Sequence, residues 1–145
     1  ARPLIDSLML SGVAKRDHLH IIVAERGSPD AHPFQFHVQW AELSVGDPSE
    51  WENPYDEIAM GKTHISARTG LMPREVQMMR PEVLREYDTL FWGNAVHGNI
   101  IVSCSGIHTR FDEAISNAIA WLCRALIQER MEKLKENASG NFYNS

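Results

Sequence analysis

The last third of the chain constrains the fold more than any other part, because it combines a strand pair with one long helix. Apolar runs over residues 92–96 and 100–106 flank the turn residues His97, Gly98 and Asn99. Beyond them, apolar side chains recur at close to 3.6 residues, which is typical of an amphipathic helix. The pattern therefore predicts a β-hairpin followed by a long C-terminal helix.

The start of this helix has a signal of its own. Thr109 and Asp112 have the spacing of a capping box, in which each side chain accepts a hydrogen bond from the other residue's backbone N–H. The predicted apolar stripe then consists of Phe111, Ile115, Ala118, Ile119, Leu122 and Leu126. From Glu129 onward the helix becomes strongly charged, and residues 138–145 resemble a flexible polar tail.

The rest of the chain alternates between helical and extended patterns. Residues 34–40 alternate apolar and polar side chains, which predicts an antiparallel strand that is half-buried on its sheet. The other expected elements are a short helix within Ala1–Lys15, a strand over His18–Glu25, a turn over Gly27–Asp30, a polar loop over Ser44–Asn53, a helix capped by Asn53 and ended by Gly70, and a helical piece from Pro73 to about Tyr87 that is interrupted near Pro81. One antiparallel sheet covered by helices is an α+β fold.

Composition narrows the class of protein. The 145 residues suit one domain, which we place at residues 1–137, and 43% hydrophobic residues can form a core. A net charge of −5 argues against a nucleic-acid partner, and no apolar run is long enough to span a membrane. We expect a cytoplasmic protein, although export remains open because the chain begins at Ala1 without a leader.

Two cysteines, Cys104 and Cys123, lie among apolar neighbours. Buried free thiols are the simpler interpretation, and a disulfide requires that their Cα atoms lie within about 7 Å of each other.

Three motifs rich in small residues stand in the second half of the chain: Gly61-Lys62-Thr63-His64-Ile65-Ser66-Ala67, Gly93-Asn94-Ala95-Val96, and Val102-Ser103-Cys104-Ser105-Gly106 followed by Asp112. Taken together, they resemble those of the GlcG/HbpS-like family, the heme-binding domain also found at the C-terminus of PduO-type proteins. The resemblance covers about Tyr55 to Glu129. Two departures stand out: Asn94 and Val96 replace a Gly and a Pro of the family pattern, and residues 23–54 differ in length and composition.

The resemblance implies a profilin-like antiparallel sheet covered by helices, assembly into homo-oligomers, and often heme as cofactor. It also implies a small-molecule ligand. His64, in the middle of the central helix, is then the candidate iron ligand, and Lys62 and Arg68 are candidate partners of the heme propionates. The alternative is that His64 makes a hydrogen bond at a subunit contact.

A second candidate group lies at the start of the last helix. Free backbone amides and the helix dipole favour an anionic ligand beside His108 and Arg110. His108 could equally be a solvated loop residue. If the protein is an enzyme, we expect a cofactor-independent isomerase, hydratase or lyase in which His64 or His108 is the acid or base.

Other sites are weaker. His18 and His20 share one face of a strand and could bind a metal with His37, but exposed strand histidines are the simpler interpretation. Ser103-Cys104-Ser105-Gly106 lacks the flanking glycines of a nucleophile elbow. We expect the tryptophans, Trp40, Trp51, Trp92 and Trp121, to lie in the core or in subunit contacts.

Overall fold

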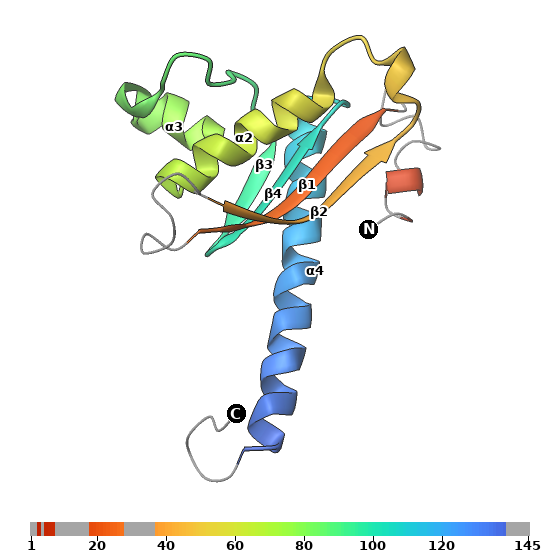
Figure 1. Cartoon of the computed structure of the whole chain (residues 1–145), viewed down its shortest axis with the longest axis vertical. Helices are drawn as coiled ribbons and strands as arrows, with labels where there is room; N and C mark the ends of the chain where they lie inside the picture. Colours follow the sequence, from red (N-terminus) through yellow and green to blue (C-terminus); the bar gives the residue numbers. More distant parts are fainter. Residues whose placement is uncertain (1–2, 4, 8–17, 28–36, 139–145) are drawn as a thin grey trace.

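A four-stranded antiparallel sheet forms the centre of the computed structural model, which describes Pro3, residues 5–7, 18–27 and 37–138 (Figure 1). The strands are β1 (Leu19–Arg26), β2 (His37–Val45), β3 (Asn94–His97) and β4 (Ile100–Ser105), in the order β2-β1-β4-β3. The helices are α2 (Tyr55–Thr69), α3 (Pro73–Met79) and α4 (Thr109–Glu136), with short 3-10 turns η1 (Pro48–Glu50) and η2 (Pro81–Val83). The predicted α+β class with a long C-terminal helix is confirmed.

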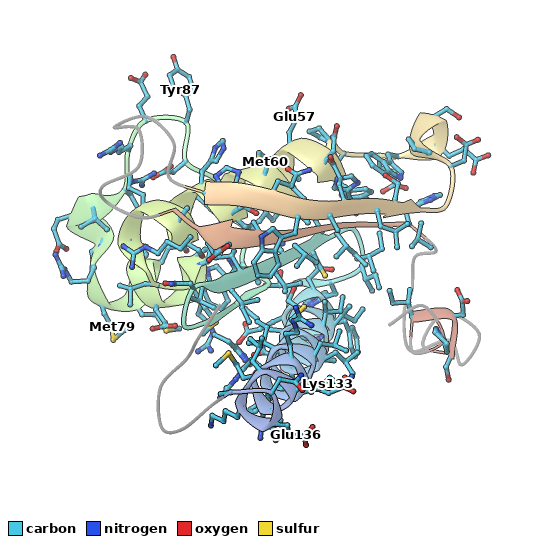
Figure 2. All side chains as sticks on the ribbon, turned by 60° about the horizontal axis from the view of Figure 1, so that its bottom comes forward. Glu57, Met60, Met79, Tyr87, Lys133 and Glu136 are labelled. Carbon is cyan, nitrogen blue, oxygen red and sulfur yellow. The ribbon has the colours of Figure 1, made fainter. Side chains whose placement is uncertain are left out.

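Helices cover both faces of the sheet. Successive side chains of a strand point to opposite faces, so Ile21 packs in the cluster that contains α4 residues, whereas Ile22 packs with α2. Figure 2 shows α2 on one side of the sheet and α4 on the other. This arrangement explains why β1 and β4 are largely buried on both faces.

Only the first part of α4 packs against the sheet. Its buried residues all lie between Asp112 and Ala120, although the helix has 28 residues and is about 42 Å long. The remainder projects beyond the sheet (Figure 1). Three apolar side chains on this projecting part, Leu122, Leu126 and Met131, are about half exposed or more.

The start of α4 differs from the predicted capping box. His108 is the N-cap, and its Nδ1 accepts a hydrogen bond from the backbone N–H of Arg110 at 3.4 Å. The carboxylate of Asp112 accepts from the N–H of Ile107 rather than from that of Thr109. Thr109 is therefore the first helical residue and not the cap. The N-cap lies one residue earlier than the capping-box spacing suggests, at His108.

The start of α2 is also different from the prediction. Its N-cap is Pro54, no side chain caps the helix, and Asn53 uses only its carbonyl, which accepts from the N–H of Tyr55. The other end agrees: Gly70 terminates the helix at a φ of +73°, which favours glycine. After α3, the interruption at Pro81 is confirmed, but helical structure ends at Val83 and not near Tyr87.

The second strand extends further than predicted. β2 continues through Ala41–Val45 because these residues pair with β1 from Leu19 to Val23, so the polar loop begins after Val45 and not at Ser44. Trp40 lies beside a register shift and is 47% exposed, so it is not a core residue. Phe34 and Phe36 lie outside the described residues.

The remaining predictions concern the ends of the chain and the strand hairpin. β1, β3 and β4 lie within two residues of their predicted bounds. Pro3 and residues 5–7 are helical, and Ile5 is fully buried, but the rest of the predicted first helix, the turn beyond Gly27 and the tail beyond Ala138 lie outside the described residues. Among the helices that the structure describes, none has the length and apolar character of a membrane span.

Candidate functional site

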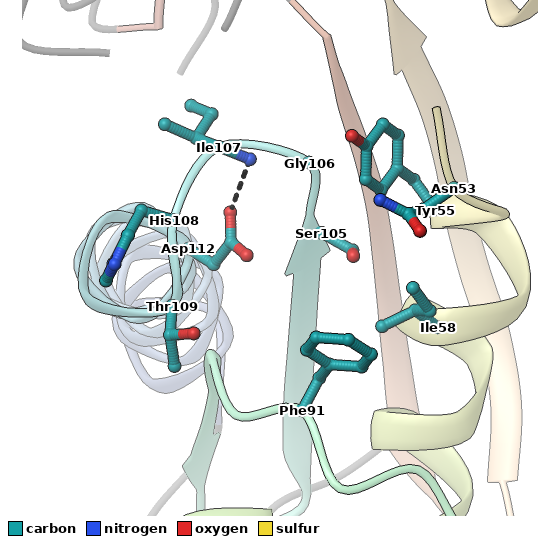
Figure 3. Close-up of a pocket in the computed structure, with 10 residues that line it drawn as sticks. All are labelled: Asn53, Tyr55, Ile58, Phe91, Ser105, Gly106, Ile107, His108, Thr109 and Asp112. Carbon is teal, nitrogen blue, oxygen red and sulfur yellow. Dashed lines mark hydrogen bonds between the residues drawn. The ribbon is translucent and has the colours of Figure 1, made fainter. Parts of the chain in front are cut away.

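A cavity of about 190 Å³ lies between the first turns of α2 and α4 (Figure 3). Its walls come from four separate segments of the chain. They are Asn53, Tyr55 and Ile58 at the start of α2, Phe91 before β3, Ser105, Gly106, Ile107 and His108 after β4, and Thr109 and Asp112 in the first turn of α4. Aromatic and aliphatic side chains therefore face the N-terminal end of a long helix.

The backbone after β4 gives the cavity its shape. Gly106 has a φ of +140°, and an added Cβ there would lie 2.4 Å from the carbonyl oxygen of His18. Only glycine allows the chain to pass this close to β1 and then turn into α4. Figure 3 shows Ser105, at the end of β4, between Tyr55 and Ile58 on one side and the first turn of α4 on the other.

One wall of the cavity belongs to a buried ion pair. The Nζ of Lys62 lies 3.5 Å from Oδ2 of Asp112 and donates hydrogen bonds to the carbonyl oxygens of Cys104 at 2.6 Å and Gly93 at 3.4 Å. Both charged side chains are buried. Burial lowers the pKa of Lys62 and raises the pKa of Asp112, while their mutual attraction opposes both shifts.

Gly93 makes this pair possible. Its φ is +104°, and an added Cβ would lie 2.5 Å from Cβ of Asp112 and 3.2 Å from Nζ of Lys62. A side chain at this position would separate the ammonium group from the carboxylate.

The other polar motif residues form a buried hydrogen-bond network between α2, β3 and β4. The hydroxyl groups of Thr63 and Ser103 are 2.9 Å apart, and the amide of Asn94 donates to the hydroxyl of Ser66 at 2.7 Å. Asn94, which replaces a glycine of the family pattern, thus has a structural partner here. The motifs that resemble the family pattern therefore hold the layers of the fold together.

The predicted ligand-binding residues do not form one group. Lys62 is enclosed by protein atoms, and Arg68 is held by an ion pair with Asp88 at 2.6 Å. His64 lies on the outer side of α2, where its ring is 5.3 Å from that of His37, between ring centroids. Partial burial lowers the pKa of both histidines. The positive charge of Arg68 lowers the pKa of His64 further, and the charge of His64 does the same for His37.

Of the predicted site residues, only His108 lines the cavity. The Nε of Arg110 donates to Nδ1 of His108 at 3.4 Å, but Arg110 itself is not a wall residue. Sequence reasoning missed the apolar walls, Tyr55, Ile58 and Phe91. The resemblance used Asp112 only as a motif position. Phe91 carried the clearest available signal, because it is an aromatic residue in a segment with neither strand nor helix periodicity.

The weaker predictions have plain outcomes. The expectation of an exposed strand histidine is wrong for His20, which is buried and hydrogen-bonded to Ser44 and Glu42. The described part of the chain contains no group of three or more side chains able to hold a metal. Cys104 and Cys123 are free thiols, and burial raises the pKa of Cys104 to about 12, which disfavours the thiolate form. Among the tryptophans, Trp121 is 59% exposed, while Trp51 and Trp92 are half-buried.

Comparison with known proteins found no matching family model, no matching curated protein and no matching solved structure.

Proposed function

We propose that this protein binds a small, flat, anionic molecule in the cavity between α2 and α4. One observation carries the proposal: aromatic and aliphatic walls face the N-terminal turn of α4 across a single cavity, and His108 lies at the edge of that turn. The rings of Tyr55 and Phe91 suit the apolar faces of a planar ligand. The dipole of α4 and His108 favour a carboxylate at the other side.

The negative charge of Asp112 in the cavity wall is compatible with an anionic ligand because Asp112 is paired with Lys62. An isolated carboxylate at this place would repel an anion, but Asp112 lies 3.5 Å from the ammonium group of Lys62 and accepts a hydrogen bond from Ile107. Its charge is therefore compensated from within the protein.

Heme does not fit the residues that were expected to hold it. His64 lies on the surface of α2. Lys62 is buried in the ion pair with Asp112, and Arg68 is paired with Asp88. The cavity of about 190 Å³ is also smaller than the roughly 300–1,000 Å³ that encloses drug-sized ligands. We therefore assign the cavity to a ligand smaller than heme.

Ligand-observed NMR with a panel of aromatic and heteroaromatic carboxylates tests the proposal. We expect Phe91→Ala to weaken binding at least tenfold, because it removes one apolar wall, and His108→Asn to weaken it while preserving the helix cap. Phe91 is 57% exposed, so its replacement leaves the fold intact. His97→Gln, on β3 and outside the cavity, is the matched control.

Equal binding by all four proteins would contradict the proposal. A hemin titration is the companion measurement: a saturable Soret band that disappears in His64→Ala would restore the heme hypothesis at a different site.

A cofactor-independent isomerase, hydratase or lyase is the second candidate, and it is favoured by the position of Asp112. A carboxyl group whose pKa is raised by burial, at the wall of a cavity and next to a lysine, is typical of acid–base catalysis. Proton exchange at a carbon next to a carbonyl group of a bound ligand, followed in D₂O, distinguishes the candidates. An enzyme shows this exchange and loses it in Lys62→Met/Asp112→Asn, which removes both charges of the buried pair, whereas a binding protein returns every ligand unchanged.

A further inference from the structure

Two histidines from distant parts of the chain meet outside the cavity. His37 is the first residue of β2, and His64 lies in the middle of α2, which packs over the same face of the sheet. Their ring centroids are 5.3 Å apart, with an angle of 49° between the ring planes. His64 is exposed and His37 is half-buried, so solvent and small ions reach both imidazoles.

The separation of the rings matches that of two ligands of one metal ion. A zinc–imidazole bond is about 2.1 Å and the ring centroid lies about 1.1 Å further from the metal, so two such rings at a tetrahedral angle have centroids about 5.2 Å apart. The observed 5.3 Å agrees with this value.

The geometry points to a metal site in which His37 and His64 bind one divalent first-row transition ion of the type that prefers imidazole, such as Zn²⁺, Ni²⁺ or Cu²⁺. No third side chain able to complete a metal-binding group is present among the described residues, so water or a small bound ligand fills the other coordination positions. The site therefore leaves coordination positions to solvent, unlike a structural zinc site with four protein ligands.

Local charge permits a cation at this position. Arg68, one turn after His64 on α2, is the positive side chain whose charge acts on His64. Its guanidinium group is paired with Asp88 at 2.6 Å, so its repulsion of a bound metal ion is largely offset.

This site is independent of the proposed ligand cavity, because neither histidine is a wall residue of that cavity. Failure of one proposal therefore leaves the other unaffected.

Isothermal titration of the full chain, without an affinity tag, with Zn²⁺ and then Ni²⁺ tests the inference. We expect one ion per chain, with affinity reduced at least tenfold in His37→Thr and in His64→Gln. Threonine suits a strand and glutamine suits a helix, so both variants preserve local structure. His97→Gln, a histidine on β3, is the matched control and retains wild-type affinity.

Paramagnetic broadening in the unmodified protein supplies a second measurement that does not depend on variants. Substoichiometric Ni²⁺ should broaden the imidazole resonances of His37 and His64 before those of the other histidines. The inference is overturned by an absence of saturable binding, by wild-type affinity in either site variant, or by broadening centred on another histidine.

Discussion

Gly93 shows how strongly one residue can determine the centre of this fold. It adopts a φ of +104° beside the Lys62–Asp112 pair, where no side chain has room. The sequence marks Gly93 only as part of a motif, because neither the left-handed backbone nor the neighbouring helix is visible from local pattern.

We predict that Gly93→Ala lowers the free energy of unfolding by about 2 kcal/mol or more, because it adds backbone strain to a steric clash. The clash is with Cβ of Asp112 at 2.5 Å and the carbonyl oxygen of Thr109 at 3.0 Å. Urea unfolding measures the change. Gly98→Ala is the control: Gly98 also has a positive φ, but nothing lies within 4 Å of an added Cβ, so only about 1 kcal/mol is lost. Equal losses in the two variants would show that packing around Gly93 is unimportant.

At the scale of elements, the Lys62–Asp112 pair connects the two helices that lie on opposite faces of the sheet. Lys62 comes from α2 and Asp112 from α4, and the Lys62 ammonium group also binds the end of β4 through the Cys104 carbonyl. The family resemblance implied that Lys62 pairs with a heme propionate. The structure shows Lys62 enclosed by the protein, with Asp112 and the Cys104 carbonyl as its partners.

We predict that Lys62→Met lowers the free energy of unfolding at pH 7 by about 3–5 kcal/mol, because it leaves a buried carboxylate without a cation. The pKa of Asp112, already raised by burial, rises further in this variant. When a carboxyl group has a higher pKa in the folded than in the unfolded state, its protonation stabilises the folded state. The variant should therefore regain stability as the pH falls through that pKa towards the ordinary value near 4.

Chemical denaturation between pH 4 and pH 8 checks this prediction. Lys62→Met/Asp112→Asn removes both charges and should recover much of the loss at pH 7. A Lys62→Met variant whose stability deficit is the same at every pH would rule out Asp112 as the cause.

Element boundaries show what local pattern can specify. The period of two in Ala41, Leu43 and Val45 was available in the sequence, but the following Gly46-Asp47-Pro48 turn led us to end the strand too early. Pairing with β1 decided the boundary. The half-buried face predicted for this strand was wrong at Trp40, which is 47% exposed, because among the described residues α4 packs mainly on β3 and β4.

At the scale of the whole molecule, the projecting part of α4 is the main unexplained feature. An isolated helix gains most of its stability from packing an apolar face, yet Leu126 is 65% exposed and Met131 is 46% exposed. The family resemblance implies a homo-oligomer, and we propose that this part of α4 packs against a second copy of the chain.

We predict that the wild-type protein is oligomeric and that Leu126→Glu converts it to a monomer, because a charge replaces an apolar contact. Light scattering after size-exclusion chromatography measures the mass. Gln128→Glu adds the same charge about 200° around the helix, on the opposite side, and should leave the mass unchanged. A monomeric wild-type protein, or equal effects of the two variants, would contradict this interface.

The sequence alone determined the order and type of most elements, because strand and helix periods arise from neighbouring residues along the chain. It also placed Lys62, Gly93, Ser103 and Asp112 in the motifs of the family resemblance. The tertiary structure decided what this set does. The strand order β2-β1-β4-β3 brings α2 against β4 and turns Lys62 inward, while His64, two residues later, faces outward beside His37. Such contacts depend on how distant segments pack against each other, and no local pattern contains that information.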